Sequence, residues 1–339
     1  QNLLLTKYKS DNVLSKEFIL ENGEIVKKAA ANMANGSAEQ LSMNMKGFAK
    51  LIPTFKSNEA LGYGTHDAER YGDCVAIKTK LQAQSDQSNL ARTKEYFKYA
   101  NAPGMMMLDS DPSREHSIDP VRLMSYLMTI WPQLKKVGYV TRGSVSAGVH
   151  KTGQKPSGSK GFHLYIGVER ADDIPRIGAV LFNRLWLEGL GYIIISSAGT
   201  MLLRAPIDAV VFSPERLDFA GKPVIKSDGL EYTPPEVVHH PGQLLDTSQI
   251  VDLTDAEISE VERLQAEAKR TMADEATDIR ADWKLAQRAK LEERGVTPDQ
   301  IEAAMSRLGS ERSDLSPDWE LSFSDGRTAT VREVLENGL

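Results

Sequence analysis

The stretch that most constrains the fold of this chain is residues 104–111, GMMMLDSD, in which four large apolar residues run directly into two carboxylates. A strand that is apolar on both faces must be covered on both faces, so this stretch predicts a central strand of a sheet. Asp109 and Asp111 lie two residues apart, which places their side chains on the same side of a strand. Pro112 then ends the strand. The sequence therefore predicts a buried strand with two carboxylates at its carboxyl end.

This pair of carboxylates predicts a binding site for divalent cations. At about 3.3 Å per residue their Cα atoms lie roughly 6.5–7 Å apart, and like charges at that spacing repel unless a cation lies between them. Oxygen ligands suit Mg²⁺ or Mn²⁺, and two such ions about 3.5–4 Å apart are a common device for nucleotidyl transfer. The alternative is a solvent-exposed strand end that is merely polar.

The composition predicts a soluble protein with a cytoplasmic location. Hydrophobic residues make up 41% of the chain and charged residues 26%, as in a globular rather than a disordered protein. No apolar run approaches the roughly eighteen residues of a membrane span, so we expect no membrane partner. Cys74 is the single cysteine, which excludes a disulfide within the chain and a zinc site built from cysteines.

The length of 339 residues predicts two domains. Residues 1–240 alternate between strand and helix patterns and predict an α+β domain. Residues 241–339 are more charged and predict a helical domain, with a capping box formed by Thr254 and Glu257. The last residues begin a hairpin and stop, so we expect a linker to a further domain of a longer protein.

Local patterns predict the individual elements of this plan. Asn22-Gly23 supplies the two positive-φ positions of a tight hairpin turn, and Asp119-Pro120 supplies an N-cap and a first helical residue. The remaining segments are assigned by their hydrophobic periodicity. We expect a hairpin over 16–28, helices over 37–52, 120–131 and 174–191, strands over 104–111 and 162–168, a strand or strand pair over 138–150, two strands within 192–212, a loop at His239-His240, and a second capping box at Thr297 and Gln300.

The distribution of charge bears on nucleic-acid binding. The net charge of −6 argues weakly against a nucleic-acid partner, because phosphate binding needs local positive charge. Residues 131–168, however, contain no Asp or Glu, although the chain has 47 acidic residues. The alternative is a solvated loop region that happens to be basic. The same window holds six basic residues: Lys135, Lys136, Arg142, Lys151, Lys155 and Lys160.

Residues 156–166, PSGSKGFHLYI, predict a phosphate-binding loop that runs directly into a strand. The glycines let the backbone approach a phosphate closely, the serines donate hydrogen bonds, and the lysine supplies a compact positive charge. The loop is not a Walker A loop, because G-x-x-x-x-G-K-[ST] is absent. A histidine in an apolar strand is more often a satisfied core residue, but behind a basic loop it is the better candidate for a phosphate ligand. The candidates are Ser157, Lys160 and His163.

A third motif is residues 202–212, LLRAPIDAVVF, which predict an apolar strand containing the lone carboxylate of Asp208. A buried carboxylate is costly unless it is paired or bound to a metal. Arg204 shares the parity of Asp208, so a buried ion pair between the two is the alternative to a metal ligand. Pro206 interrupts this parity, because a proline marks a bulge or an edge.

Taken in order, the three motifs resemble those of the archaeo-eukaryotic primase (AEP) superfamily, which includes primase-polymerases of plasmids, phages and integrated mobile elements. The matching pieces are D-x-D on a strand, S-G-x-x-G-x-H entering a strand, and then a single Asp, and they span roughly residues 90–220. The resemblance implies a catalytic core with an RRM-like sheet and a second α/β part. It also implies template-directed joining of nucleotides with two divalent ions, Mg²⁺ or Mn²⁺.

The resemblance further implies roles for individual residues. The carboxylates would bind the metals and act as catalytic residues: Asp109, Asp111 and Asp208. Polar and basic residues would bind the incoming NTP or dNTP: Ser157, Lys160, His163 and Arg204.

The remaining partners follow from the same resemblance. Some relatives carry a zinc-binding stem, and a single cysteine leaves no obvious counterpart here, so no zinc is expected. Contacts to a single-stranded DNA template are then expected from Arg142, Lys151, Lys155 and the helical domain. A helicase domain is a candidate for the further part of a longer chain. The expected activity is that of a DNA primase or primase-polymerase in replication.

Two other classes of protein remain open at this point. A D-x-D glycosyltransferase that uses a nucleotide-sugar would account for Asp109 and Asp111, but not for the Ser-Gly loop, His163 and Asp208 in that order. A non-catalytic single-stranded-DNA-binding replication initiator would have a decayed site, whereas all three carboxylates are present.

Overall fold

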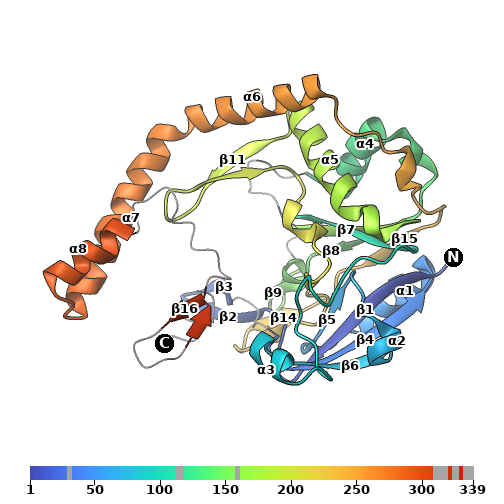
Figure 1. Cartoon of the computed structure of the whole chain (residues 1–339), viewed down its shortest axis with the longest axis horizontal. Helices are drawn as coiled ribbons and strands as arrows, with labels where there is room; N and C mark the ends of the chain where they lie inside the picture. The colour runs from blue at the N-terminus through green and yellow to red at the C-terminus, as the bar shows by residue number, and fades with distance from the viewer. Residues whose placement is uncertain are drawn as a thin grey trace. The chain divides into compact units, whose positions relative to one another are not determined.

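The computed structural model describes residues 1–28, 33–111, 116, 118–156, 161–307, 320–322 and 328–330. The fold is α+β, as expected, and its main element is a mixed sheet of eight strands (Figure 1). The strands are β1 (Leu3–Ser10), β4 (Gly36–Met43), β5 (Glu59–Gly62), β6 (Cys74–Ile77), β7 (Gly104–Ser110), β8 (Tyr139–Gly143), β10 (Phe162–Val168) and β15 (Val237–His240). Their order is β15-β8-β10-β7-β1-β4-β6, with β5 paired to β1.

Strand β7 occupies the central position that its sequence predicts. It pairs antiparallel with β10 and parallel with β1, so it has a neighbour on each side. The four side chains from Met105 to Leu108 are all buried in the main hydrophobic core. The strand ends at Ser110, so Asp109 is its second-last residue and Asp111 lies just beyond its end.

The chain also forms smaller sheets and helices. The other strands are β2 (Glu17–Glu21), β3 (Glu24–Lys28) and β13 (Val224–Ile225) in one sheet, β9 (Val149–Lys151) with β14 (Leu230–Tyr232), β11 (Tyr192–Ile195) with β12 (Met201–Arg204), and β16 (Glu320–Ser322) with β17 (Thr328–Thr330). The α-helices are α1 (Met45–Leu51), α2 (Ala68–Tyr71), α3 (Lys80–Ser85), α4 (Pro120–Ile130), α5 (Ile174–Leu187), α6 (Asp255–Thr271), α7 (Ala273–Glu293) and α8 (Pro298–Arg307). Short 3₁₀ helices are η1 (Ile52–Thr54), η3 (Pro132–Lys136), η4 (Val145–Gly148), η5 (Ala171–Asp173), η6 (Ala209–Phe212) and η7 (Thr247–Gln249).

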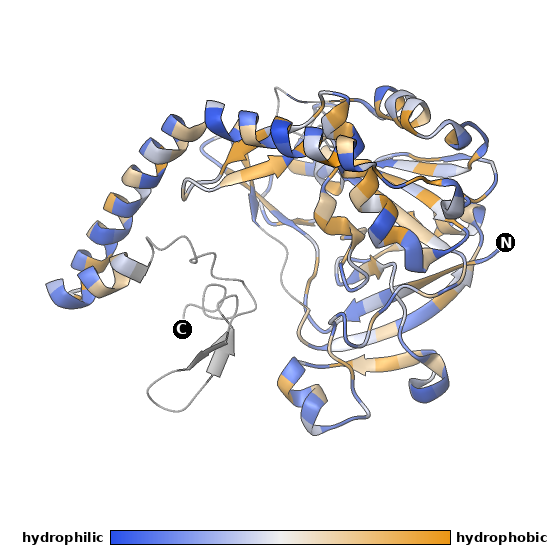
Figure 2. Ribbon diagram, turned by 45° about the horizontal axis from the view of Figure 1, so that its top comes forward, coloured by the Kyte–Doolittle hydropathy of each residue, from blue (hydrophilic) through white to orange (hydrophobic). Residues whose placement is uncertain are grey.

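The chain divides into two compact units. Unit 1 comprises residues 1–192 and 203–268, and unit 2 comprises residues 193–202 and 269–339. Residues 241–268, which the sequence pattern predicts to be part of the helical domain, thus belong to unit 1. In unit 2, hydrophilic residues dominate the surface of α7 (Figure 2). Across the described parts of both units, no helix is both long and apolar enough to cross a membrane.

Helices α4 and α5 lie above strands β7 and β8 in the view of Figure 1. The inward face of α5 contributes Ile177, Leu181 and Leu185 to the main core, and all three side chains are fully buried. Gly178 lies against the ring of Phe212, because a Cβ placed on it would come within 2.5 Å of that ring. The close approach fixes 3₁₀ helix η6 against α5, at the side of β7.

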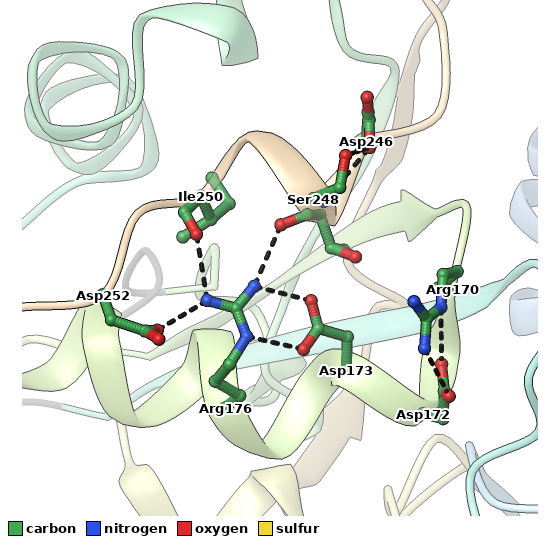
Figure 3. A network of polar contacts seen from close by, with 9 residues as sticks. Arg170, Asp172, Asp173, Arg176, Asp246, Ser248, Ile250 and Asp252 are labelled. Atoms are coloured by element: carbon green, nitrogen blue, oxygen red, sulfur yellow. Dashed lines mark hydrogen bonds and ion pairs between the residues drawn. The ribbon is translucent and has the colours of Figure 1, made fainter.

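A polar network ties the start of α5 to the chain that leads into α6 (Figure 3). Arg176 donates two hydrogen bonds of 2.7 Å to the carboxylate of Asp173 and one of 2.6 Å to Asp252. Its guanidinium also donates to the backbone carbonyls of Thr247 at 3.0 Å and Ile250 at 2.9 Å. The rigid guanidinium of Arg176 thus donates to five acceptors, and these hydrogen bonds hold the connection in place.

Most of the expected elements are confirmed. The hairpin forms as β2 and β3, with Asn22 and Gly23 at φ values of 51° and 79°. Asp119 caps α4 through a 2.9 Å hydrogen bond from the N–H of Arg122. The Thr254 and Glu257 capping box forms in both directions.

Two of the local expectations were wrong. Residues 37–52 are not one helix: residues 36–43 form strand β4, and α1 begins after Asn44, whose side chain caps it. Pairing of β4 along the full length of β1 outweighs the local helical pattern. His239 and His240 lie in strand β15 rather than in a loop, and the ring of His240 stacks on Tyr139 with 4.2 Å between centroids.

Candidate active site

Adjacent strands bring the first two sequence motifs together. In the antiparallel pair formed by β7 and β10, His163 is the direct register partner of Asp109. The Nε2 atom of His163 lies 3.6 Å from Oδ1 of Asp109. The side chain of Asp109 is 30% exposed and that of His163 only 12%, so the carboxylate is partly open to solvent while the ring is mostly buried.

Asp208, from the third motif, contacts Asp109 through the backbone. The N–H of Asp208 donates a 2.9 Å hydrogen bond to the carbonyl oxygen of Asp109. The sequence predicts Asp208 inside a strand, but this prediction is wrong. Strand β12 ends at Arg204, before Pro206. The side chain of Asp208 instead caps η6 by accepting from the N–H of Val210 at 3.1 Å, and it is half-buried.

Asp111 lies at the exposed edge of this site. It is exposed, just beyond the end of β7. A Cβ placed on Gly161 would come within 3.0 Å of Oδ1 of Asp111, so the glycine of the second motif gives the carboxylate its room. Residues 112–115 and 157–160 lie outside the described residues, so Pro112 and the candidates Ser157 and Lys160 have no described place in this site.

The three predicted carboxylates interact electrostatically. Burial raises the pKa of Asp109, and the neighbouring charges of Asp218, Asp111 and Asp208 raise it further, whereas His163 acts in the opposite direction. A carboxylate that is disfavoured by burial and by three like charges is stabilised by a bound cation. The donor set, made only of carboxylate oxygens, is the one that Mg²⁺ and Mn²⁺ prefer.

The residues therefore fit a divalent cation chemically. Within the described ranges, no three His, Cys, Asp or Glu side chains are already arranged as a metal-binding group. Asp208 holds a capping hydrogen bond to Val210, and Asp111 stands at the exposed rim.

Asp218, the most heavily contacted carboxylate of the site, is not among the residues that the sequence motifs predict. Asp218 is fully buried and accepts hydrogen bonds from the hydroxyl groups of Tyr63 at 2.7 Å and Tyr165 at 2.9 Å. Its Oδ1 atom lies 3.2 Å from Nδ1 of His163. Burial alone would raise the pKa of Asp218, but His163, Arg142 and Tyr63 together hold the pKa well below its usual range. The local sequence, SPERLDF, reads as an ordinary turn and gave no signal of this role.

Arg142 belongs to the interior rather than to a template surface. Only 4% of its side chain is exposed. It donates to the carbonyl oxygen of Ala220 at 3.3 Å, and Nη2 lies 3.7 Å from Oδ1 of Asp218. A buried guanidinium that faces a buried carboxylate does not reach a template strand, so Lys151, half-buried on β9, and the exposed Lys155 are the template candidates that remain.

Arg204 lies at the end of β12, and its charge reaches the same region as the carboxylates. Burial raises the pKa of Tyr192, Arg204 lowers it, and Asp111 and Asp208 raise it. The charges of Arg204, Asp111 and Asp208 thus all act on the hydroxyl group of Tyr192. The buried ion pair between Arg204 and Asp208 that the sequence offers as an alternative is not formed in the described part of the chain.

Comparisons with known proteins leave the site to be judged on its geometry. No family model matches the chain, no curated protein matches it, and no solved structure matches it. The resemblance of the three motifs to the AEP superfamily therefore stays a prediction.

Proposed function

We propose that this chain is a nucleotidyl transferase of the AEP superfamily, a primase-polymerase that joins nucleotides on a single-stranded DNA template. The observation that carries the proposal is the meeting of three separate motifs at one point. His163 is the register partner of Asp109, and the backbone N–H of Asp208 donates to the carbonyl of the same aspartate. Residues nearly a hundred positions apart in the chain thus surround one half-buried carboxylate.

The carboxylates of Asp109, Asp111 and Asp208 would hold the Mg²⁺ or Mn²⁺ ions in this proposal. Bound there, the ions supply activation of the attacking 3′-hydroxyl and stabilisation of the departing pyrophosphate. The chain itself contributes position and charge. Asp218 orients His163, and the imidazole and Arg204 present hydrogen-bond donors and positive charge toward the anionic nucleotide.

The two alternatives explain less of this arrangement. A glycosyltransferase that uses a D-x-D pair needs Asp109 and Asp111, but not a histidine in register with the first aspartate or a third carboxylate linked to it. A non-catalytic initiator needs neither the burial of Asp109 nor the neighbouring carboxylates that, together with burial, raise its pKa. These features are expected of a site that binds cations.

The test is incorporation of labelled nucleotides on single-stranded DNA with Mg²⁺ or Mn²⁺, with and without a primer. Asp109→Asn is the decisive variant, because it keeps the size of the side chain and removes one negative charge. We expect synthesis to fall by at least about a hundredfold, while the thermal unfolding temperature does not fall. Full synthesis by a folded Asp109→Asn protein would exclude the proposed metal site.

The primer arm separates two forms of the proposal. Product without a primer identifies a primase, and product only with a primer identifies a polymerase. Tight binding of single-stranded DNA with no product under any condition would instead favour the initiator. Release of sugar from a nucleotide-sugar would favour the glycosyltransferase.

A further inference from the structure

A cavity of about 480 Å³ lies beside helix α2, in a part of the chain that no sequence motif includes. Two segments line it, residues 65–71 and residues 95–100. Two backbone hydrogen bonds join these segments. The N–H of Thr65 donates to the carbonyl of Lys98 at 2.8 Å, and the N–H of Lys98 donates to the carbonyl of Thr65 at 3.0 Å. The two walls are therefore linked to each other by the fold itself.

Other contacts hold the individual walls in place. His66 lines the cavity and is only 5% exposed. Its Nε2 atom donates to the carbonyl of Gly72 at 2.8 Å, and its ring meets Phe97 edge-on with 5.9 Å between the centroids. Asp67 caps α2 by accepting from the N–H of Arg70 at 3.1 Å. The cavity is thus formed before any ligand binds, as is usual for binding sites in proteins.

Three half-buried tyrosines line this cavity: Tyr71, Tyr96 and Tyr99. The first two pack on the hydrophobic cluster around Tyr8 and Phe97, and the third packs on the main core. None of the three rings stacks on another aromatic ring of a described residue, and none of their hydroxyl groups has a hydrogen bond to one. Each ring is therefore anchored in the core while part of it stays open toward the cavity.

The charged residues of the cavity are balanced in sign. Arg70 and Lys98 are positive, Asp67 and Glu95 are negative, and all four are exposed. Such a set gives a phosphate group alone little net attraction. The guanidinium of Arg70 lies over the ring of Tyr71, with its Cζ atom 5.0 Å from the ring centroid. Tyrosine rings with a cation beside them are a platform on which a nucleobase stacks.

One short stretch of chain connects the cavity to the candidate active site. Tyr63 donates its hydroxyl to Asp218 of that site, and Thr65, two residues later, lines the cavity. Gly64 lies between them, and its N–H donates to the carbonyl of Pro214 at 3.0 Å. At about 3.3 Å per residue, the Cα atoms of Tyr63 and Thr65 are roughly 7 Å apart. A strand that reaches the carboxylates can therefore place another of its bases in the cavity.

We propose that this tyrosine-lined cavity binds an unpaired base of single-stranded DNA. The inference rests on the proposed function and adds to it a contact for the template strand. Stacking on aromatic side chains suits a template of any sequence, because every base has a π-face. A free nucleotide also carries a base, but none of the predicted metal-binding carboxylates lines the cavity, so its triphosphate would have no metal site there.

The experiment measures equilibrium binding of a fluorescent single-stranded DNA to the full chain. Tyr96→Leu removes the ring and keeps an apolar side chain, whereas Tyr96→Phe keeps the ring. Tyr71→Leu is a second variant of the same cavity, for use if Tyr96→Leu fails to fold. We expect both leucine variants to weaken DNA binding about 5–100-fold. Tyr96→Phe should bind DNA as the wild type does.

Tyr126→Leu is the matched control. Tyr126 is also half-buried and has a guanidinium near its ring, with Cζ of Arg122 5.9 Å from the ring centroid, but it does not line this cavity. Tyr126→Leu should therefore bind DNA as the wild type does. Equal losses of DNA affinity in Tyr96→Leu and Tyr126→Leu would contradict a site at the cavity.

An oligonucleotide with abasic positions shows which part of the DNA is bound. We expect the wild type to bind it more weakly than ordinary DNA, and Tyr96→Leu to bind it about as well as the wild type does. The same weakening by Tyr96→Leu on both oligonucleotides would show that the cavity contacts the backbone, and would overturn the inference. Weakened binding of a nucleoside triphosphate with Mg²⁺, with unchanged DNA binding, would assign the cavity to a free nucleotide and overturn the strand assignment.

The outcomes also separate this inference from the proposed function. DNA binding that depends on Tyr96 and Tyr71, without incorporation of nucleotides, would support the cavity and remove the polymerase assignment. Unchanged DNA affinity in folded Tyr96→Leu and Tyr71→Leu proteins that still incorporate nucleotides would overturn the inference alone. Failure of the wild type both to bind DNA and to incorporate nucleotides would overturn both.

Discussion

His163 lies between two carboxylates, with Nδ1 at 3.2 Å from Oδ1 of Asp218 and Nε2 at 3.6 Å from Oδ1 of Asp109. The first carboxylate is fully buried, and the second is partly open to solvent. The same ring nitrogen, Nδ1, also lies 3.1 Å from the hydroxyl of Tyr165, so one side of the ring contacts buried polar groups while its other nitrogen lies on the side of Asp109. This order, from buried aspartate to ring to open aspartate, makes Asp218 a positioning residue for the candidate site.

Asp218→Asn is expected to reduce nucleotide incorporation by about 10–100-fold, because the ring of His163 loses the charged partner that orients it. The measurement is incorporation at saturating and at limiting nucleotide. Tyr63→Phe is the comparison, since it removes one hydroxyl that donates to the opposite oxygen of the same carboxylate. That variant should lose about 1 kcal/mol of unfolding free energy and much less activity. Equal losses of activity in the two variants would argue against an orienting role.

Arg142→Met is expected to destabilise the fold by about 3–5 kcal/mol, because it removes a buried cation from the neighbourhood of a buried carboxylate. Urea unfolding gives the value. Lys155→Ala, at an exposed position in the same basic window, should leave the unfolding free energy unchanged and weaken binding of single-stranded DNA. A stable Arg142→Met protein with impaired DNA binding would restore Arg142 to the template surface.

The network at Arg176 predicts a dependence of stability on pH. Hydrogen bonds from Arg176 hold the pKa of Asp173 below its ordinary value, although partial burial acts against them. A depressed pKa in the folded state contributes stability that is present above the unfolded pKa of about 4 and is lost as the pH falls through the folded value. Asp173→Asn should therefore cost about 1.5–3 kcal/mol at neutral pH.

The check on this assignment is the pH profile of the two proteins. The difference in unfolding free energy between wild type and Asp173→Asn should shrink as the pH is lowered below about 4. A difference that stays constant over that range would show that the carboxylate charge is not what stabilises the connection to α6.

Gly178→Ala is expected to reduce nucleotide incorporation, although the substitution adds only one methyl group. Alanine favours a helix by about 1 kcal/mol over glycine, but here its Cβ would meet the ring of Phe212 at 2.5 Å. Displacing Phe212 moves η6, whose first residue follows Asp208. Incorporation and thermal unfolding of Gly178→Ala, Phe212→Leu and the double variant test the coupling. Activity in the double variant should exceed that of Gly178→Ala; equal activity would exclude the clash as the cause.

The sequence was most informative where the local pattern is strong. The run ending in Asp109 predicted its own central strand, because only a strand covered on both faces has that composition. His163 and Asp208 were found as members of ordered motifs. Asp208 lies beside Asp109 through a backbone hydrogen bond, but not in the expected strand, because β12 ends before Pro206 and the aspartate caps η6 instead.

The failures share a physical cause, which is partnership across long sequence separations. Asp218 acquires its role from Tyr63 and His163, each more than fifty residues away, and nothing in its own neighbourhood records them. Arg142 lies in a basic window typical of a nucleic-acid surface, yet β8 turns its side chain toward the interior. Residues 37–52 carried a helical pattern that pairing with β1 overrode.

The bond between the N–H of Asp208 and the carbonyl of Asp109 joins two catalytic candidates through main chain alone. Their separation is thus set before any ligand arrives and does not depend on either side chain. A cation that binds there needs to order only two short side chains, so most of the conformational entropy of assembling the site is lost during folding rather than during binding. Substitutions of the surrounding side chains can therefore alter which ligand the site prefers while the distance between its two anchoring residues is preserved.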